Sequence, residues 1–146
     1  MDSGFKFSST LFRAVISWIP LTVLAIFNGT IWQSALAPFM NDHFAGALLC
    51  ITLILIVTAY TGILWFIYPG WKKNGVWTTG VIWVTLTIAL EFAVIITNSQ
   101  PWDMLFYRYN LFAGRLWLLV VVWIAVAPKM VSLWATRLRV SRAGNA

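Results

Sequence analysis

Four long runs of apolar residues dominate the chain, at about residues 14–37, 44–68, 76–97 and 109–131. Each run is near the ~20 residues that a helix needs to cross a hydrocarbon core of ~30 Å. Backbone groups in lipid must be hydrogen-bonded within the protein, and no alternation of period two favours a β-barrel. The pattern therefore predicts an all-α protein with four transmembrane helices, followed by a basic tail at 132–146.

Short polar links separate the runs, and links of this length predict that helices adjacent in the sequence are antiparallel neighbours. Asn41 or Asp42 is expected to cap the second helix. The first run is too long for the core of a signal peptide, so we expect a retained helix. Because almost every residue belongs to a run or adjoins one, residues 1–146 are expected to form a single membrane domain, an antiparallel four-helix bundle.

The composition agrees with a membrane protein, since 61% of the 146 residues are hydrophobic and only 10% are charged. Soluble domains carry roughly a quarter charged residues. The net charge of +6 comes mainly from Lys and Arg residues that gather on one side of the predicted bundle, so we expect both termini in the cytoplasm and no nucleic-acid partner. The cations expected to contact anionic lipid headgroups are Lys72, Lys73, Arg137, Arg139 and Arg142.

Two ionisable residues interrupt the apolar runs, Glu91 in the third and Arg115 in the fourth. Each lies six residues from the outer end of its run, which places both ~9 Å inside the hydrocarbon. A charge in a bilayer is costly without a partner, so an ion pair between these two residues is expected. Such a pair either serves a function or only fixes the register of the helices, and the sequence leaves both open.

Carboxamides lie at similar depths and extend this pair into a predicted polar layer of Asn28, Glu91, Asn110 and Arg115. Second-tier candidates are Gln33, Thr87 and Asn98; Thr87, Glu91 and Asn98 share one helix face.

Small residues four apart, at Ala25 and Gly29 and again at Ala89 and Ala93, predict close contact between the first and third helices.

Nine of the ten tryptophans divide into two expected groups. Five lie near helix ends or in loops and fit an interfacial aromatic belt, namely Trp18, Trp71, Trp77, Trp102 and Trp134, whereas four deeper ones are expected to pack within the bundle. These four are Trp32, Trp83, Trp117 and Trp123.

Residues for other chemistry are few. His43 is the sole histidine and Cys50 the sole cysteine, so a multi-histidine metal site, bis-histidine haem ligation or a two-cysteine redox relay within the chain is excluded. No nucleophile elbow, phosphate-binding loop or zinc-protease motif is present. We therefore expect no metal and no cofactor, and a non-enzymatic protein is favoured over an enzyme.

Three segments carry a resemblance to a known family: Phe27-Asn28-Gly29-Thr30, Glu91-Phe92, and residues 109–117 with the sequence YNLFAGRLW. They resemble a family of small, functionally uncharacterised four-helix proteins of the bacterial inner membrane, and the likeness spans most of the chain. The resemblance implies a four-span fold in the inner membrane and carries no activity. A basic residue is usual in that family where this chain has Trp32, and this departure disfavours an anion-binding role for the layer.

The expected function is that of an accessory subunit or a small binding component built around the polar layer. Its expected partners are membrane lipids and a larger membrane complex or a second copy of the chain. The alternative is a small proton- or cation-coupled transporter in which Glu91 titrates. A lipid-modifying enzyme using Glu91 as acid or base is the third hypothesis, but no nucleophile accompanies that residue.

Overall fold

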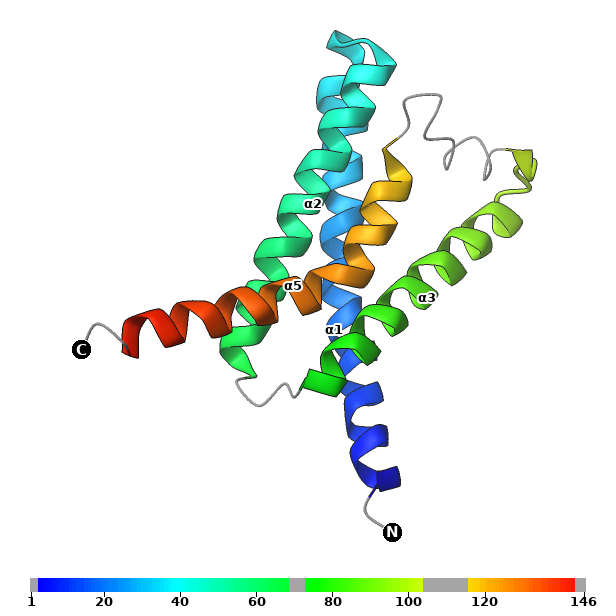
Figure 1. Cartoon of the computed structure of the whole chain (residues 1–146). Coiled ribbons are helices and arrows are strands. Elements are labelled where there is room, and N and C mark those ends of the chain that lie inside the picture. The colour runs from blue at the N-terminus through cyan, green and yellow to red at the C-terminus, as the bar shows by residue number, and fades with distance from the viewer. Residues whose placement is uncertain (1–2, 69–72, 104–115, 144–146) are drawn as a thin grey trace.

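The computed structural model describes residues 3–68, 73–103 and 116–143. All regular secondary structure in the part of the chain it covers is helical. It contains α1 (Ser3–Ile31), α2 (Asp42–Ile67), α3 (Lys73–Thr97) and α5 (Trp117–Ala143) (Figure 1). Each of these helices is long and apolar enough to cross a membrane, which indicates a multi-pass membrane protein.

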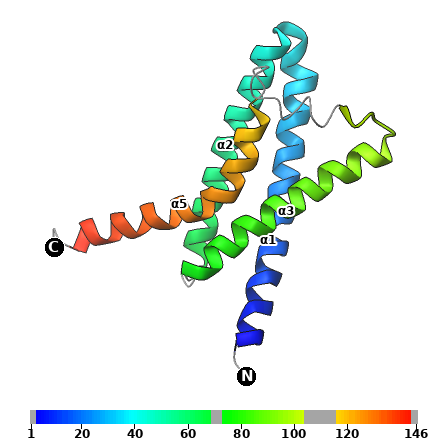
Figure 2. The same ribbon diagram turned by 45° about the vertical axis from the view of Figure 1, so that its right-hand side comes forward.

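The first helix differs most from its predicted bounds. It begins at Ser3 rather than near residue 14, and it continues through Pro20. It also stops being α-helical at Ile31, where a π-helical turn (Trp32–Leu36) and a 3₁₀ turn (Ala37–Phe39) follow. The chain reverses there, and α2 runs back beside α1 (Figures 1 and 2).

Local hydrogen bonds define where α2 begins and where α3 ends. The side chain of Asn41 accepts a hydrogen bond of 3.0 Å from the backbone N–H of His43, which confirms Asn41 as the N-cap of α2. At the end of α3, Ser99 adopts a left-handed φ of 51°. The N–H of Gln100 donates to the carbonyl of Ile95, and the N–H of Ser99 to that of Ile96, which together form a Schellman cap.

Each long helix packs mainly on two others, in the cyclic order α1, α2, α5, α3. Consequently α2 and α3, although adjacent in the sequence, lie diagonally, and the prediction that all sequential helices are neighbours is wrong for this pair. A short link limits how far apart two helix ends lie, but it does not fix the direction in which the next helix leaves. Figures 1 and 2 show α3 crossing the other helices obliquely.

A close approach of α3 to α5 occurs where sequence motifs gave no signal. A Cβ added to Gly80 of α3 would lie 2.1 Å from the carbonyl oxygen of Ala125 in α5. By contrast, Ala89 and Ala93 are exposed, and a Cβ added to Gly29 would meet no atom within 4 Å. The predicted close contacts at these small-residue pairs are therefore wrong, because the pattern does not reveal which face of a helix is buried.

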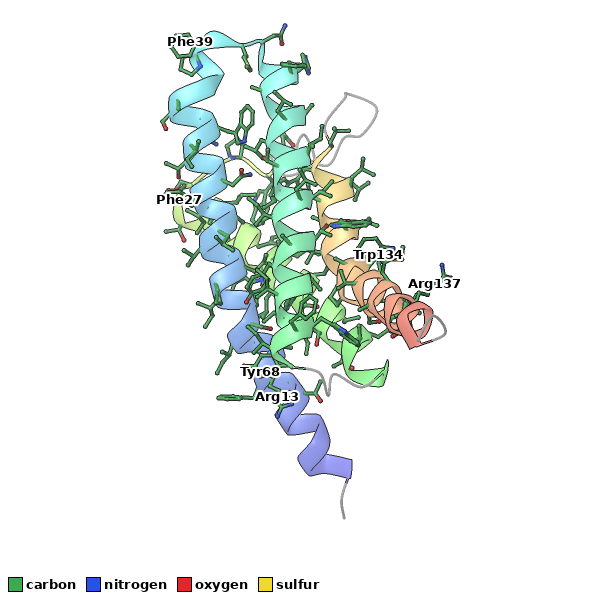
Figure 3. All side chains as sticks on the ribbon, turned by 90° about the vertical axis from the view of Figure 1, so that its left-hand side faces the viewer. Arg13, Phe27, Phe39, Tyr68, Trp134 and Arg137 are labelled. Atoms are coloured by element: carbon green, nitrogen blue, oxygen red, sulfur yellow. The ribbon has the colours of Figure 1, made fainter. Side chains whose placement is uncertain are left out.

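The last helix continues through the predicted basic tail. Residues 109–115 of its predicted span lie outside the described residues, and the described helix runs from Trp117 to Ala143. Pro128 lies within it, and α5 bends so that its C-terminal half leaves the bundle (Figures 1 and 2). Arg137 is exposed on that half, which also carries Arg139 and Arg142 (Figure 3).

The bundle buries one apolar core and presents many apolar side chains outwards. Trp83 and Val57 are completely buried at its centre, whereas Phe27 is 66% and Phe66 81% exposed. Phe27 points away from the bundle in Figure 3. A soluble monomer rarely presents apolar surface on this scale, so the outward face is suited to lipid.

Candidate functional site

Glu91 lies on α3 and faces α5. The indole Nε1 of Trp117 donates a hydrogen bond of 2.5 Å to its carboxylate Oε1. Hydrogen bonds to an ionised carboxylate are shorter and stronger than neutral ones, so this contact joins α3 to α5 firmly. Glu91 is half-buried, and no charged residue whose burial the structure describes is fully buried.

Two members of the predicted polar layer, Asn110 and Arg115, lie outside the described residues. The ion pair between Glu91 and Arg115 therefore stays a prediction. Lys72 also lies outside the described residues, and Lys73 is the first residue of α3.

Glu91 lines a cavity of about 170 Å³ to which all four long helices contribute. The lining residues are Trp18, Leu21, Thr22, Ala25 and Ile26 of α1, Leu53 and Val57 of α2, Thr87, Leu90 and Glu91 of α3, and Trp117 and Ile124 of α5. Most of this wall is apolar. Its size is comparable with the ~150 Å³ of an apolar protein cavity that takes up benzene.

Trp18 provides a second indole in the wall of this cavity. Its Nε1 donates to the hydroxyl of Thr87 at 3.1 Å, and that hydroxyl bonds the carbonyl of Trp83 in its own helix at 2.8 Å. Trp18 therefore joins α1 to α3 inside the bundle, and its assignment to the interfacial belt is wrong. In the sequence, the only signal for Trp18 was its position near the end of an apolar run. Because α1 begins before that run, Trp18 lies well within the helix and not at its end.

Asn28 belongs to a second polar cluster, between α1 and α2. It is only 8% exposed, and its Nδ2 donates to the carbonyl of Leu49 at 3.3 Å. The hydroxyl of Thr52 lies 3.0 Å from the Oδ1 of Asn28 and accepts a 3.0 Å hydrogen bond from the indole of Trp32. Within the described residues, the predicted layer is thus divided between an Asn28 cluster and the Glu91 cavity.

The second-tier candidates separate in the same way. Thr87 lines the cavity beside Glu91, as their shared helix face predicts. Asn98 is exposed at the end of α3, where its Nδ2 donates to the carbonyl of Val94 at 2.8 Å. Gln33 is exposed in the π-helical turn. Only Thr87 of these three therefore joins the site.

Two further indole N–H groups join neighbouring helices. Trp83 of α3 donates to the carbonyl of Ala14 in α1 at 3.0 Å, and Trp123 of α5 donates to the hydroxyl of Thr58 in α2 at 2.9 Å. The predicted interior packing of Trp83, Trp117 and Trp123 is confirmed. A buried indole needs an acceptor, and for these three tryptophans the acceptor lies on a neighbouring helix, whereas the buried Nε1 of Trp65 has no hydrogen-bond partner among the described residues.

The chemistry of the cavity follows from these groups. A carboxylate favours a cationic or hydrogen-bond-donating group, and aromatic walls favour a cation or an apolar body. Among the described residues, no lysine, arginine, serine, cysteine or histidine lines it. The hydroxyls of Thr22 and Thr87 also line it.

No family model, no curated protein and no solved structure matches this chain.

Proposed function

We propose that this protein is a non-enzymatic binding component of a membrane, and that its central cavity binds a small lipophilic cation. One observation carries the proposal: Glu91, the only glutamate in the chain, lines a largely apolar cavity built by all four long helices. An ionisable side chain inside a transmembrane bundle belongs to a functional site more often than to a purely structural contact.

The walls define the chemical class of the occupant. An ionised carboxylate attracts a cation, and low dielectric surroundings strengthen that attraction, so a cationic ligand would compete with the interactions that Glu91 makes within the protein. Trp18 and Trp117 add aromatic surface of the kind that recognises quaternary ammonium groups. The volume of about 170 Å³ suits one aromatic ring with a small cationic group rather than a drug-sized molecule.

Isothermal titration calorimetry in mild detergent tests the proposal with two ligands of the same shape. Phenyltrimethylammonium carries the positive charge, and tert-butylbenzene is its neutral counterpart. The wild-type protein should bind the cation at least about tenfold more tightly, equivalent to ~1.4 kcal/mol. Glu91→Gln should abolish this preference while leaving the helix content, measured by circular dichroism, unchanged.

Asp103→Asn is the matched control, because Asp103 is an exposed carboxylate outside the cavity. It should retain the preference for the cation. If Glu91→Gln folds and still prefers the cation as strongly as the wild type, the cavity is not a cation site and the proposal fails.

A second candidate function is coupled transport, because a proton and a cation would compete for the same carboxylate in the cavity. In proteoliposomes, an inward flux of phenyltrimethylammonium should then drive protons outwards, and Glu91→Gln should stop both movements. If flux continues unchanged in the folded variant, coupled transport through Glu91 is excluded, while binding remains to be judged by calorimetry.

We further propose an antiparallel bundle in a bacterial inner membrane, with both termini in the cytoplasm. The excess of Lys and Arg at one end of the predicted spans supports this orientation, and the family resemblance supports the location. Alkaline phosphatase fused after Phe39 should be active, because it reaches the periplasm. The same enzyme fused after Ala146 should be inactive.

The proposed partners are membrane lipids and a larger complex or a second copy of the chain. Exposed cations such as Arg137, on the half of α5 that leaves the bundle, support contact with anionic headgroups. Purification in mild detergent should recover the chain in an assembly. Recovery as a monomer under all mild conditions would refute the partner role.

A further inference from the structure

A second hollow lies between α1 and α2, at the end where α2 finishes. It measures about 390 Å³ and shares no lining residue with the Glu91 cavity. Its walls are largely apolar, with Phe12, Ile16 and Pro20 contributed by α1 and Leu64 by α2. Arg13 and Tyr68 also line it.

The charged end of this groove is formed by Arg13. Its guanidinium carbon lies 5.9 Å from the ring centroid of Tyr68, the C-cap residue of α2. Both side chains are exposed and meet at the same end of the helix pair in Figure 3. No acidic residue lines the groove among the described residues, so the guanidinium faces a surface without negative charge.

The deeper polar groups of the groove are already hydrogen-bonded within the protein. The hydroxyl of Tyr60 donates to the carbonyl of Ser17 at 2.6 Å, and the hydroxyl of Ser17 donates to the carbonyl of Ala14 at 3.0 Å. These bonds leave the groove floor suited to an apolar occupant. The groove is therefore cationic at one end and apolar along its length.

We propose that this groove binds an anionic phospholipid, with an acyl chain between α1 and α2 and the phosphate against Arg13. From Arg13 to Pro20 the helix rises ~10 Å, enough to hold the first part of an acyl chain beneath its headgroup. A basic residue at the end of a groove between transmembrane helices pairs with the phosphate of such a lipid while the acyl chain lies along the groove. A zwitterionic lipid brings a second positive charge close to Arg13, and a free phosphate leaves the apolar part of the groove unfilled.

Native mass spectrometry of the full chain tests the proposal. The protein is exchanged into nanodiscs of phosphatidylcholine and phosphatidylglycerol in equal amounts, released, and scored for the lipid that remains bound. Wild type should retain one phosphatidylglycerol in preference to phosphatidylcholine. Arg13→Gln should lower that preference about fivefold, because one cation near the surface contributes about 1 kcal/mol towards anionic lipid.

Three comparisons make the result specific. Lys129→Gln removes a cation of α5 that does not line the groove and is not among the expected headgroup contacts, so it should retain the wild-type preference. Arg13→Lys keeps the charge and should retain most of it. Ile16→Trp fills the apolar part of the groove and should reduce retention of both lipids.

Two outcomes would overturn the proposal. Equal losses in Arg13→Gln and Lys129→Gln would mean that the protein attracts anionic lipid through its general charge. Displacement of the retained lipid by millimolar inorganic phosphate would mean that the site recognises the phosphate alone and that the apolar groove contributes nothing.

Discussion

The contact between Gly80 and Ala125 predicts the effect of a single added methyl group on the packing of α3 against α5. In Gly80→Ala, the new Cβ would lie 2.1 Å from the carbonyl oxygen of Ala125, whereas ordinary contacts begin at 3.4 Å. Both atoms are held by helical backbone, so the two helices must separate by roughly 1 Å. Overpacking of this kind costs about 1–3 kcal/mol of folding free energy.

Gly62→Ala is the matched control, because a Cβ at Gly62 of α2 would meet nothing within 4 Å. Alanine is favoured over glycine in a helix by about 1 kcal/mol, and both variants gain this term. The difference between them therefore isolates the contact, and Gly80→Ala should be about 1–3 kcal/mol less stable than Gly62→Ala. Unfolding by sodium dodecyl sulfate in mixed micelles, followed by far-ultraviolet circular dichroism, measures this difference. Equal stabilities of the two variants would refute the close packing of α3 on α5.

Two further substitutions test individual hydrogen bonds. Trp117→Phe removes the donor to the Glu91 carboxylate, and Trp123→Phe removes the donor to the neutral hydroxyl of Thr58. In the same unfolding assay, Trp117→Phe should cost more, by about 1 kcal/mol, because a carboxylate oxygen accepts a stronger hydrogen bond than a hydroxyl oxygen does; equal losses would contradict this difference between the two acceptors. Ser99→Gly should stabilise the protein by up to about 1 kcal/mol, because glycine adopts the left-handed φ of 51° without steric cost. A loss of stability in this variant would contradict the Schellman cap.

The four spanning helices could be predicted from the sequence because lipid restricts the backbone to few structures. Apolar runs of sufficient length must become helices, so the predicted 44–68 and 76–97 agree closely with Asp42–Ile67 and Lys73–Thr97. The start of α1 at Ser3 was missed because a helix that extends beyond the membrane needs no hydrophobic run. The helix order around the bundle was also missed, since hydropathy does not specify which faces meet.

The candidate site was predicted in part, for a related reason. The cost of a charge in lipid singled out Glu91, and the period of the helix placed Thr87 beside it. Trp18 and Trp117 could not be assigned to the same cavity, because they come from α1 and α5 and nothing in a single sequence states their distance from α3. Asn28 was expected to join Glu91, yet its carboxamide bonds Leu49 and Thr52 of α2 instead.

The most direct test of the central claim is a titration followed through the indole N–H resonances of the tryptophans by two-dimensional nuclear magnetic resonance. Trp18 and Trp117 line the Glu91 cavity, whereas Trp123 bonds Thr58 outside it and Trp134 is 70% exposed. On addition of phenyltrimethylammonium, the resonances of Trp18 and Trp117 should shift in a saturable manner, and Glu91→Gln should abolish these shifts. Shifts confined to Trp134, or shifts of Trp18 and Trp117 that persist unchanged in Glu91→Gln, would contradict a cation site at Glu91.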